Sequence, residues 1–418
     1  MDYRVLIIIF LEELFALFLL KKENIIKDIR SFIVCTLLIV AAFSLRLCFF
    51  DYETTDYQWF LTKWVDFYRE HAGFQGMKYS NGNYNIPYLY FLALFSYSSV
   101  RDLYLIKLLS CFFDVLLAYS GLLFVKKCGA SALRSTVCFF LILFLPTVII
   151  NSSVWAQCDS IYISLAILGI ALALPDSNGT VGKPVLSMIC IAVSFGFKLQ
   201  AVFIMPIFII LWLNCRFKWY HFLIFPITYF IIILPAVFLG RPLSDCLTLY
   251  IDQADTVGSS LNYNAPSVFA LIGDVTNPET AARYGIIAAF AAMVFIILVA
   301  ILLKGKLSSR SILCLSLLMV CIIPFLLPHM HDRYFYSSDV LSAILAVMIS
   351  LAVPCAVFTQ FASLICYLAY LKTYYLRIGR TLLTTDKGAI ALIFSMLICI
   401  ICFLSTLTDN RKNIKNQT

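Results

Sequence analysis

The chain has 418 residues, of which 62% are hydrophobic and only 13% charged, and its formal net charge is +8. This composition excludes an ordinary soluble domain, in which roughly a quarter of the residues are charged. Lys and Arg fall in short clusters between apolar runs and not in a stripe interleaved with aromatic residues, so nucleic acid is not an expected partner. The sequence therefore predicts an all-α, polytopic membrane protein whose main partner is the lipid bilayer.

Apolar runs of about the length that a membrane-spanning helix needs recur along the chain, and they predict about 12 to 13 transmembrane helices. Glu12 and Glu13 lie midway along the first run, where charge is costly, so that run is expected to be interfacial or tilted. A basic loop, expected in the cytoplasm, follows this helix, and the two together form a separate N-terminal segment, residues 1–31. The predicted runs are 3–20, 32–50, 104–125, 135–150, 160–174, 184–198, 200–213, 222–239, 285–303, 311–327, 339–353, 355–371 and 389–407.

Basic residues next to membrane helices are retained in the cytoplasm, and this sets the orientation. Clusters around Lys21, Lys126, Arg216, Lys304 and Arg411 alternate consistently if the run 86–99 does not cross but lies in the interface. The basic connection with Lys372, Arg377, Arg380 and Lys387 falls on the outer side, against the rule. The predicted outer connections are 51–103, 151–159, 240–284 and 328–338, with a tight reversal near 198–200.

Polar residues concentrate in these outer connections. Asp56 and Tyr57 belong to a loop in which acids alternate with aromatic rings, a combination that suits a sugar but also occurs in a solvated loop with an aromatic belt. Trp155, Gln157 and Asp159 follow between two apolar runs, where a carboxylate needs water, a cation or a substrate as its partner. Asp56 and Asp159 are therefore the candidate catalytic residues.

Cationic groups lie in two other outer connections. Lys198 and Gln200 stand where one apolar run ends and the next begins, although a lysine there can also extend to the headgroups. The loop after residue 328 contains His331 and Arg333, and the planar guanidinium suits phosphate oxygens. Its His and Asp residues also suit a metal, but ligands so close in sequence more often share a hydrogen-bond network. We predict no metal ligands and no certain cofactor, with a divalent metal as the open alternative.

These distant residues map to one membrane face, which is the decisive observation. An acid could take the proton of an acceptor hydroxyl, and cations could stabilise charge on a departing phosphate. Deeper in the membrane, Lys107 and Asp114 share one helix face two turns apart, too far to touch, and are expected to anchor neighbouring helices. The fifteen cysteines show no metal or disulfide spacing.

The motifs together resemble one family. Trp155-Ala156-Gln157-Cys158-Asp159-Ser160 is similar to its Trp-Gly-Gln-x-Asp-Ser element, with Ala156 in place of Gly. Further similar segments follow in the same order from residue 32 to the C-terminus: Asp56-Tyr57, Asn83 to Tyr90, Lys198-Leu199-Gln200, Asn262 to Pro266, and Met330 to Phe335. They resemble the bacterial GT-C-fold membrane glycosyltransferases related to the second mannosyltransferase of GPI-anchor synthesis.

The resemblance implies a GT-C-like catalytic domain over residues 32–418, with interfacial helices in the first outer loop. It also implies a polyprenyl-phosphate-linked sugar as donor, an active site on the extracytoplasmic face of the cell membrane, and usually inversion at the anomeric carbon. Asp56 would be the catalytic base, and Lys198, His331 and Arg333 would engage the donor phosphate. The other expected substrate-binding residues are Tyr57, Trp155, Gln157, Gln200, Asn264 and Tyr334.

The sequence thus predicts a hexosyltransferase that moves one monosaccharide, such as mannose or another hexose, onto a cell-envelope glycan or glycolipid. A transporter or flippase of envelope lipids is the alternative from another class, but such proteins often contain two related halves, and no convincing internal repeat is found. A polysaccharide polymerase or ligase is a second alternative, since it would also act on the outer face.

Overall fold

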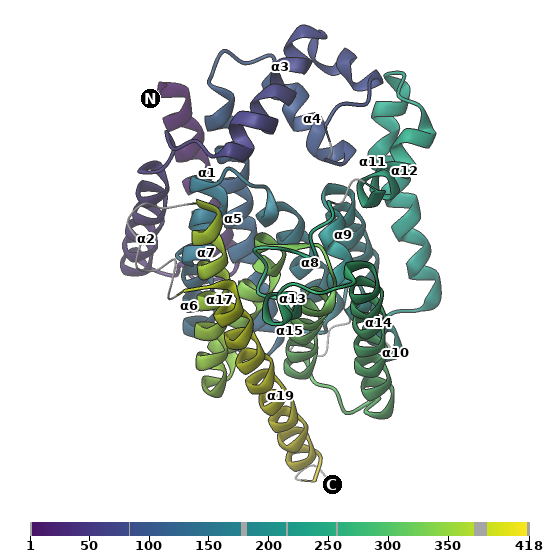
Figure 1. The fold of residues 1–418 in the computed structure, drawn as a ribbon. Coiled ribbons are helices and arrows are strands. Elements are labelled where there is room, and N and C mark those ends of the chain that lie inside the picture. The colour runs from purple at the N-terminus through teal and green to yellow at the C-terminus, as the bar shows by residue number, and fades with distance from the viewer. Residues whose placement is uncertain are drawn as a thin grey trace.

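A computed structural model describes residues 2–82, 84–176, 182–214, 216–255, 258–371 and 383–415. The predicted all-α class is confirmed, since long helices dominate and the described residues contain only one pair of two-residue strands (Figure 1). The helices of the first half are α1 (Tyr3–Lys22), α2 (Ile29–Leu47), α3 (Thr62–Glu70), α4 (Ile86–Phe95), α5 (Asp102–Lys127), α6 (Ala132–Leu143), α7 (Pro146–Ile149), α8 (Asp159–Ala173), α9 (Pro184–Phe197) and α10 (Pro206–Leu213). Those of the second half are α11 (Ile224–Phe238), α12 (Leu243–Asp255), α13 (Val268–Ile272), α14 (Pro278–Leu302), α15 (Ser309–Leu326), α16 (Tyr336–Met348), α17 (Val353–Leu371) and α19 (Thr385–Lys415).

Shorter turns of helix and the strand pair connect these elements. Two π-helices, η1 (Tyr57–Leu61) and η3 (Ile150–Val154), precede α3 and α8. Strands β1 (Asn262–Tyr263) and β2 (Met330–His331) pair in parallel, with Asn262 opposite Met330. The remaining short elements are the 3₁₀ helices η2 (Gly73–Lys78), η4 (Leu199–Phe203), η5 (Trp219–Leu223), η6 (Asp332–Phe335) and η7 (Ser350–Ala352).

The structure supports a membrane protein but not the predicted number of spans. Among the described residues, seven helices are long and apolar enough to cross a membrane, and the count rises to eight if the pair 132–143 and 146–154, bent by 44°, is one span. Each of the thirteen predicted runs contains helix, but several of these helices are short, and the first run, with its two glutamates, is not among the seven. The prediction of 12 to 13 spans is therefore not confirmed.

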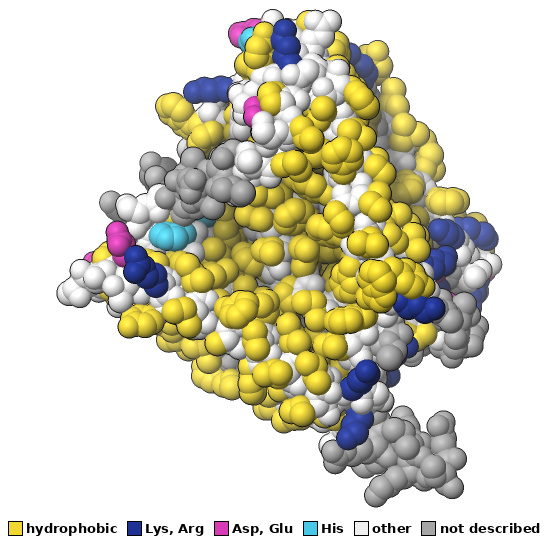
Figure 2. All heavy atoms as spheres, turned by 90° about the vertical axis from the view of Figure 1, so that its right-hand side faces the viewer, with side chains coloured by type: hydrophobic (Ala, Val, Ile, Leu, Met, Phe, Trp, Pro, Cys, Tyr) yellow, Lys and Arg dark blue, Asp and Glu magenta, His cyan; other side chains and the backbone are white. Residues whose placement is uncertain are grey.

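A broad hydrophobic surface covers the side formed by α10, α11 and α14. Large apolar side chains are exposed there, including Phe230 and Ile231 on α11 and Phe290 and Phe295 on α14. Figure 2 shows this face as a wide hydrophobic region with a hollow in its middle and with Lys and Arg along its edges. Because exposed apolar surface of this extent is unfavourable in water, this face suits contact with lipid.

The predicted cytoplasmic clusters gather at one end of the helical bundle. Side chains and backbone groups from four of the clustered regions contact one another there, which supports a common side for them. The contacts are an ion pair between Lys126 and Glu23, a hydrogen bond from Arg310 Nε to the Cys128 carbonyl (3.3 Å), and one from Gly305 N to Asn214 Oδ1 (3.3 Å). Of the basic connection that broke the rule, Lys372, Arg377 and Arg380 lie outside the described residues.

Helices α8 and α9 place two predicted site residues at the other end. They pack side by side and run in opposite directions, so that the first residue of α8, Asp159, lies beside Lys198, which follows the end of α9. Close approach is possible because Gly169 lacks a side chain where the Ser187 carbonyl would stand 3.1 Å from a Cβ atom. Ser187 also donates to the Gly169 carbonyl at 2.5 Å, which fixes the register of the pair.

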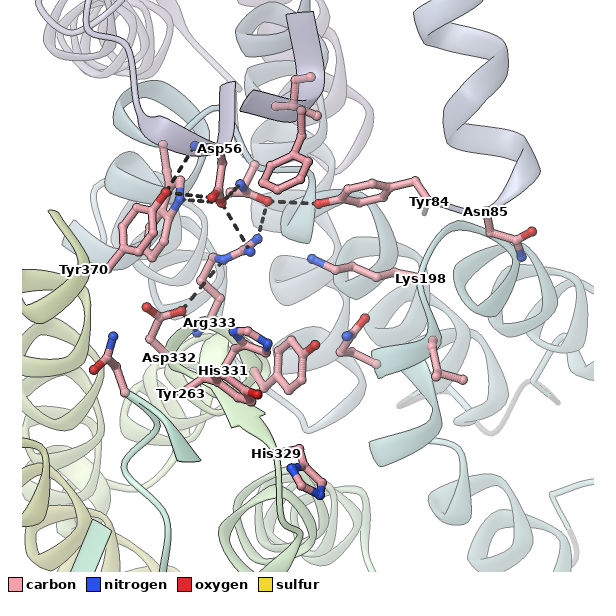
Figure 3. Close-up of a pocket in the computed structure, with 18 of the residues that line it drawn as sticks. Asp56, Tyr84, Asn85, Lys198, Tyr263, His329, His331, Asp332, Arg333 and Tyr370 are labelled. Atoms are coloured by element: carbon pink, nitrogen blue, oxygen red, sulfur yellow. Dashed lines mark hydrogen bonds and ion pairs between the residues drawn. The ribbon is translucent and has the colours of Figure 1, made fainter. Parts of the chain in front are cut away.

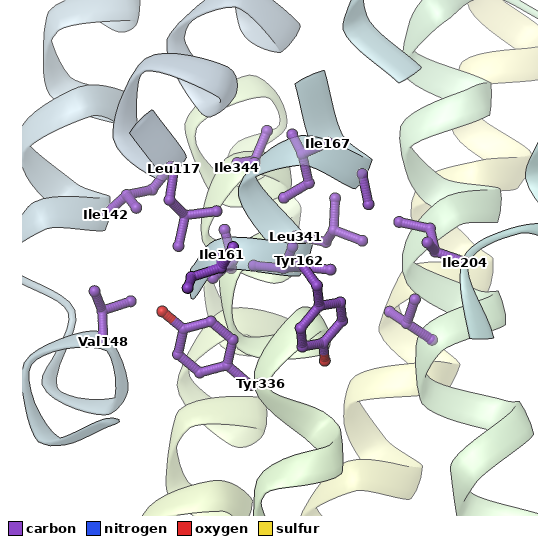
Figure 4. Close-up of a cluster of buried hydrophobic side chains, with 14 of the residues drawn as sticks. Leu117, Ile142, Val148, Ile161, Tyr162, Ile167, Ile204, Tyr336, Leu341 and Ile344 are labelled. Atoms are coloured by element: carbon purple, nitrogen blue, oxygen red, sulfur yellow. The ribbon is translucent and has the colours of Figure 1, made fainter. Parts of the chain in front are cut away.

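The core between these helices is closely packed and apolar. Helices α5, α8, α15 and α16 contribute many of its side chains, and Figure 4 shows Leu117, Ile161, Leu341 and Ile344 close together there. These side chains are buried, with none above 2% exposed. The residues at this end of the bundle are therefore supported by closely packed helices and not by surface loops alone.

The first outer connection folds into a cap over the bundle, formed by α3, η2 and α4 (Figure 1). Helix α4 covers only 10 residues of the run 86–99, which is too short to span a bilayer, as predicted. The hydroxyl of Tyr90 accepts from Ala236 N (2.9 Å) and donates to the Ile232 carbonyl (3.2 Å). These contacts attach the cap to α11 above the hydrophobic side of the bundle.

Candidate active site

A cavity of about 800 Å³ lies between the cap and the bundle, at the end opposite the basic clusters. Segments from across the chain line it: the loop before η1, the residues around η3, the break between α9 and η4, the β1–β2 pair, η6 and the end of α17. Cavities of this size can enclose a ligand with several polar groups. The cavity is therefore the candidate active site.

Asp56 lies in the cavity wall and is held by both of its oxygens. Its Oδ2 atom accepts hydrogen bonds from Trp155 Nε1 (3.0 Å) and Gln157 Nε2 (2.8 Å). Its Oδ1 atom accepts from the hydroxyl of Tyr370 at 2.7 Å (Figure 3). The Asp56 side chain keeps 23% of its surface exposed. A carboxylate so fixed, yet reachable from the cavity, has the geometry of a general base.

The backbone around Trp155 explains how one segment supplies two donors to Asp56. The π-helix η3 ends at Val154, and Ala156 then adopts a φ of 60°, in the left-handed region that favours glycine. The chain reverses there before α8 begins, and the Trp155 and Gln157 side chains both reach Oδ2 of Asp56. The glycine that the resembling motif has at this position suits such a backbone.

Asp159 and Lys198 form a buried ion pair at the cavity wall, with Lys198 lining the cavity and Asp159 behind it. The Asp159 side chain is 2% exposed and that of Lys198 10% exposed. Asp159 Oδ2 also accepts a hydrogen bond from Asn151 Nδ2 at 2.7 Å. Lys198 does not extend toward headgroups, as the simpler interpretation allowed, but lies among the rings of Tyr84 and Tyr162, with Nζ 5.7 and 5.9 Å from their centroids.

Arg333 connects the two carboxylates. Its guanidinium hydrogen bonds to Gln157 Oε1 and lies 3.5 Å from Asp56 Oδ2 and 3.8 Å from Asp159 Oδ2. The same group lies 5.0 Å from the centroid of the Trp155 ring, within cation–π range. Lys198 and Arg333 thus balance the charges of Asp56 and Asp159.

The β1–β2 pair forms the opposite wall. The ring of Tyr263 stacks on that of His331, with centroids 4.7 Å apart and planes 11° apart, and Asn264 forms a bridge to His331 with a φ of 59°. Burial, with the nearby charges of Arg333 and Lys198, lowers the pKa of His331 to about 4. His331 is therefore neutral near pH 7 and could meet a phosphate as a hydrogen-bond donor but not as a cation.

Asp332 adds a carboxyl group whose pKa is raised above its ordinary value. Its side chain lies beside Arg333, with Oδ1 accepting from Arg333 N at 2.8 Å and lying 3.9 Å from Arg333 Nε. Burial raises the pKa of Asp332 to about 7, against the opposing effect of the Arg333 charge. A group that titrates near physiological pH beside a phosphate-binding candidate can tune the charge of the site.

Aromatic rings line the cavity below the cap. Trp64 meets Tyr84 edge to face, with centroids 5.5 Å apart, and Phe60 lies 6.0 Å from Trp64. The Tyr84 hydroxyl donates to Gln157 Oε1 at 3.0 Å, so this wall joins the polar network around Asp56. Rings beside hydrogen-bonding groups form a surface suited to a ligand with both apolar and hydroxyl faces.

The structure brings most of the predicted site residues together. Gln200 and Tyr334 line the cavity beside Lys198, and Gln200 Oε1 is buried without a hydrogen-bond partner in the part of the chain that the structure describes. Tyr57 does not line the cavity: its hydroxyl donates to Asp102 Oδ1 at 3.3 Å, and the residue is 5% exposed. The predicted residues that line the cavity are Asp56, Trp155, Gln157, Lys198, Gln200, Asn264, His331, Arg333 and Tyr334, with Asp159 directly behind them.

The most important residue that sequence reasoning missed is Tyr370. It belongs to α17, an apolar helix, where a single tyrosine gives no signal of its own. Its ring stacks on Trp155 with centroids 4.2 Å apart and planes 17° apart, and its hydroxyl reaches Asp56. Tyr84 was also missed as a site residue, although it lies in a quoted motif.

The deeper charged pair anchors helices, as expected. Lys107 Nζ donates to backbone carbonyls between α2 and η1, including that of Tyr52 at 2.7 Å, and does not contact Asp114. Asp114 Oδ2 instead accepts from Arg46 (2.9 Å) and from Ser152 (2.7 Å) in η3. This buried network supports the π-helix from which Trp155 and Gln157 extend.

No group of three or more His, Cys, Asp or Glu side chains within the described ranges could hold a metal ion. His331 and Asp332 take part in the aromatic and polar network of the cavity. The described cysteines are all free thiols. Comparison of the chain with protein-family models and with curated proteins gives no match.

Proposed function

We propose that this protein is a membrane glycosyltransferase that transfers one monosaccharide, such as mannose or another hexose, from a polyprenyl-phosphate donor to a cell-envelope glycan or glycolipid. The observation that carries the proposal is the convergence of Asp56, Lys198 and Arg333 on one cavity at one end of an apolar helical bundle. The proposal includes a relationship to the GT-C family whose motifs this sequence resembles.

The positions of the charges support a single displacement step. The acceptor oxygen would attack the anomeric carbon on the face opposite the phosphate, and Asp56 would accept the hydroxyl proton. The bond between that carbon and the phosphate oxygen would break, and its electron pair would stay on the phosphate. Arg333 and Lys198 would stabilise this developing charge, and the configuration at the anomeric carbon would invert.

The surroundings of the cavity support a lipid-linked donor. Helix α11, which carries large exposed apolar side chains, packs against α9, whose last residue, Phe197, lines the cavity. A polyprenyl chain could remain in contact with the bilayer while its phosphate and sugar enter the cavity. The rings of Trp64 and Tyr84 would then face the sugar or the acceptor.

The placement of charges also supports an enzyme on the extracytoplasmic face over a transporter. The described basic clusters gather at the end of the bundle opposite the cavity, and such clusters mark the cytoplasmic side. The carboxylates and cations of the cavity lie at one end only, whereas a transport path would need polar groups reached from both sides in turn.

The test is the replacement Asp56→Asn, assayed in membranes supplied with a polyprenyl-phosphate-linked sugar. We expect transfer to fall by about two orders of magnitude or more, the usual contribution of a general base. Asp66→Asn is the matched control, because Asp66 is a solvent-exposed carboxylate of α3 paired with Arg69. Unchanged turnover in Asp56→Asn would remove Asp56 from the mechanism.

A further inference from the structure

The hydroxyl of Tyr370 occupies the place at Asp56 that a substrate hydroxyl would need. Three donors surround Asp56 Oδ2: Trp155 Nε1, Gln157 Nε2 and the guanidinium of Arg333. Among the residues that the structure describes, Oδ1 has a single side-chain donor, the Tyr370 hydroxyl at 2.7 Å. An acceptor hydroxyl that passes its proton to Asp56 would therefore approach Oδ1, the less crowded oxygen, where the Tyr370 hydroxyl already lies (Figure 3).

Tyr370 also has a second partner to which its hydroxyl can turn. Thr55 Oγ1 lies 2.6 Å from the Tyr370 oxygen, and Asp56 N donates to that oxygen at 3.2 Å. The phenolic proton can therefore point to Asp56 or to Thr55 without any movement of the ring. Stacking on Trp155 holds the ring in place during such a change.

We propose that Tyr370 determines specificity for the acceptor over water: its hydroxyl shields Asp56 Oδ1 until the acceptor hydroxyl takes over this hydrogen bond and the phenolic proton turns to Thr55. This proposal rests on the proposed function and extends it to the choice of acceptor. In the unwanted reaction, water attacks the anomeric carbon, gives its proton to Asp56, and leaves free sugar and polyprenyl phosphate. A small, mobile water gains little from the cavity walls, whereas a bound acceptor can offset the loss of the Tyr370 hydrogen bond.

The test compares hydrolysis and transfer in Tyr370→Phe, which keeps the stacked ring and removes only the hydroxyl. Membranes receive a donor with a radiolabelled sugar, with and without acceptor, and free sugar and glycosylated acceptor are counted separately. We expect the ratio of hydrolysis to transfer to rise by roughly three- to tenfold, the factor that one hydrogen bond supplies. Tyr119→Phe is the control, because its hydroxyl bonds to Glu23 at the opposite end of the bundle.

A second variant changes the balance in the other direction. Thr55→Val removes the alternative partner of the Tyr370 hydroxyl and leaves it on Asp56 more of the time. We expect the KM for the acceptor to rise by a similar factor, with little change in kcat at saturating acceptor. A purely structural role of Tyr370 would lower hydrolysis and transfer together in both variants.

The outcomes separate the two proposals. If the wild-type protein transfers sugar but both variants leave the ratio of hydrolysis to transfer and the acceptor KM unchanged, the role given to Tyr370 is wrong and the proposed function stands. If the wild-type protein neither transfers nor hydrolyses any polyprenyl-phosphate-linked hexose, the proposed function fails and the role of Tyr370 fails with it.

Discussion

Lys198 and Asp159 form an ion pair within the protein although 39 residues separate them in sequence. The pair exists because α8 begins where α9 ends. Replacing Lys198 with Met should leave the Asp159 carboxylate buried beside a single remaining cation, Arg333. We expect a loss of roughly 3–5 kcal/mol of stability, the usual effect of breaking a buried pair. Thermal unfolding in detergent, followed by the loss of monodisperse protein, measures it.

The double variant Lys198→Met with Asp159→Asn separates folding from chemistry. Because no buried charge is then left unpaired, we expect most of the stability to return. Transfer should remain impaired, since one of the two cations beside the proposed phosphate position is gone. Recovery of both stability and transfer in the double variant would show that Lys198 has no part in the reaction.

Ala156 offers a second test, of the backbone that shapes the site. A φ of 60° costs an alanine about 1–2 kcal/mol relative to an ordinary backbone, and glycine removes that strain. Glycine also gives the unfolded chain more conformational freedom, which lowers the free energy of unfolding. The two effects therefore oppose each other. We therefore expect Ala156→Gly to change stability by less than about 1 kcal/mol and to keep transfer activity. Ala156→Val should prevent folding, because a β-branched residue adopts this conformation poorly.

A glycine replacement in a regular helix gives the contrast. Ala166 lies in the middle of α8 and is buried, like Ala156. Ala166→Gly should cost about 1 kcal/mol, since glycine is unfavourable within a helix. Equal losses at positions 156 and 166, measured by the same thermal unfolding, would contradict the role given to the left-handed turn.

The helices and the grouping of the site residues on one face could be predicted from sequence, because apolar runs mark each helix locally and basic connections can be counted along the chain. Apolar runs locate helices, and each predicted run does contain one. Counting the basic connections then assigns Asp56, Gln157 and Arg333 to a single face, and the structure brings these three into hydrogen-bonding distance. The number of spans could not be counted in this way, because apolar length alone does not separate a short buried helix from one that crosses the bilayer.

Other features depend on tertiary contacts that no run of residues reveals. Tyr370 reaches Asp56 from a helix more than 300 residues away. Tyr57 follows Asp56 directly, but η1 turns its side chain away from the cavity toward Asp102. The β1–β2 pair has only two residues in each strand, too few for the alternation that predicts strands. Arg46, which neutralises Asp114, lies in a run that otherwise predicts a plain membrane helix.

The raised pKa of the Asp332 carboxyl group predicts that donor binding depends on pH. Its carboxyl pKa is raised to about 7, mainly by burial, so the group is neutral at pH 6 and ionised at pH 8. Ionisation adds a third carboxylate to Asp56 and Asp159 around Arg333, which weakens the attraction of this cation for a phosphate. We expect the donor KM to rise by roughly three- to tenfold from pH 6 to pH 8. Initial rates at several donor concentrations across this range measure the change.

Asp332→Asn should remove most of this dependence, because the amide cannot ionise. His331 does not titrate in the same range, since its pKa is lowered to about 4 by burial and the neighbouring cations. Asp66→Asn, on the exposed surface of α3, should keep the pH profile of the wild-type protein. A donor KM that rises equally in Asp332→Asn would assign the titration to another group.

The orientation of the site predicts which introduced cysteines an impermeant thiol reagent reaches in intact cells. Asp66 lies in the cap above the cavity with a side chain that is 54% exposed, and Lys304 lies exposed at the basic end of the bundle. Cys48 is the one exposed thiol among the described cysteines, so both substitutions are made together with Cys48→Ser to reduce background labelling. We expect Asp66→Cys to react in intact cells and Lys304→Cys to react only after permeabilisation, because basic clusters stay in the cytoplasm. Labelling of both positions from outside, or of Lys304→Cys alone, would contradict an extracytoplasmic site, and the protein carrying Cys48→Ser alone measures the remaining background.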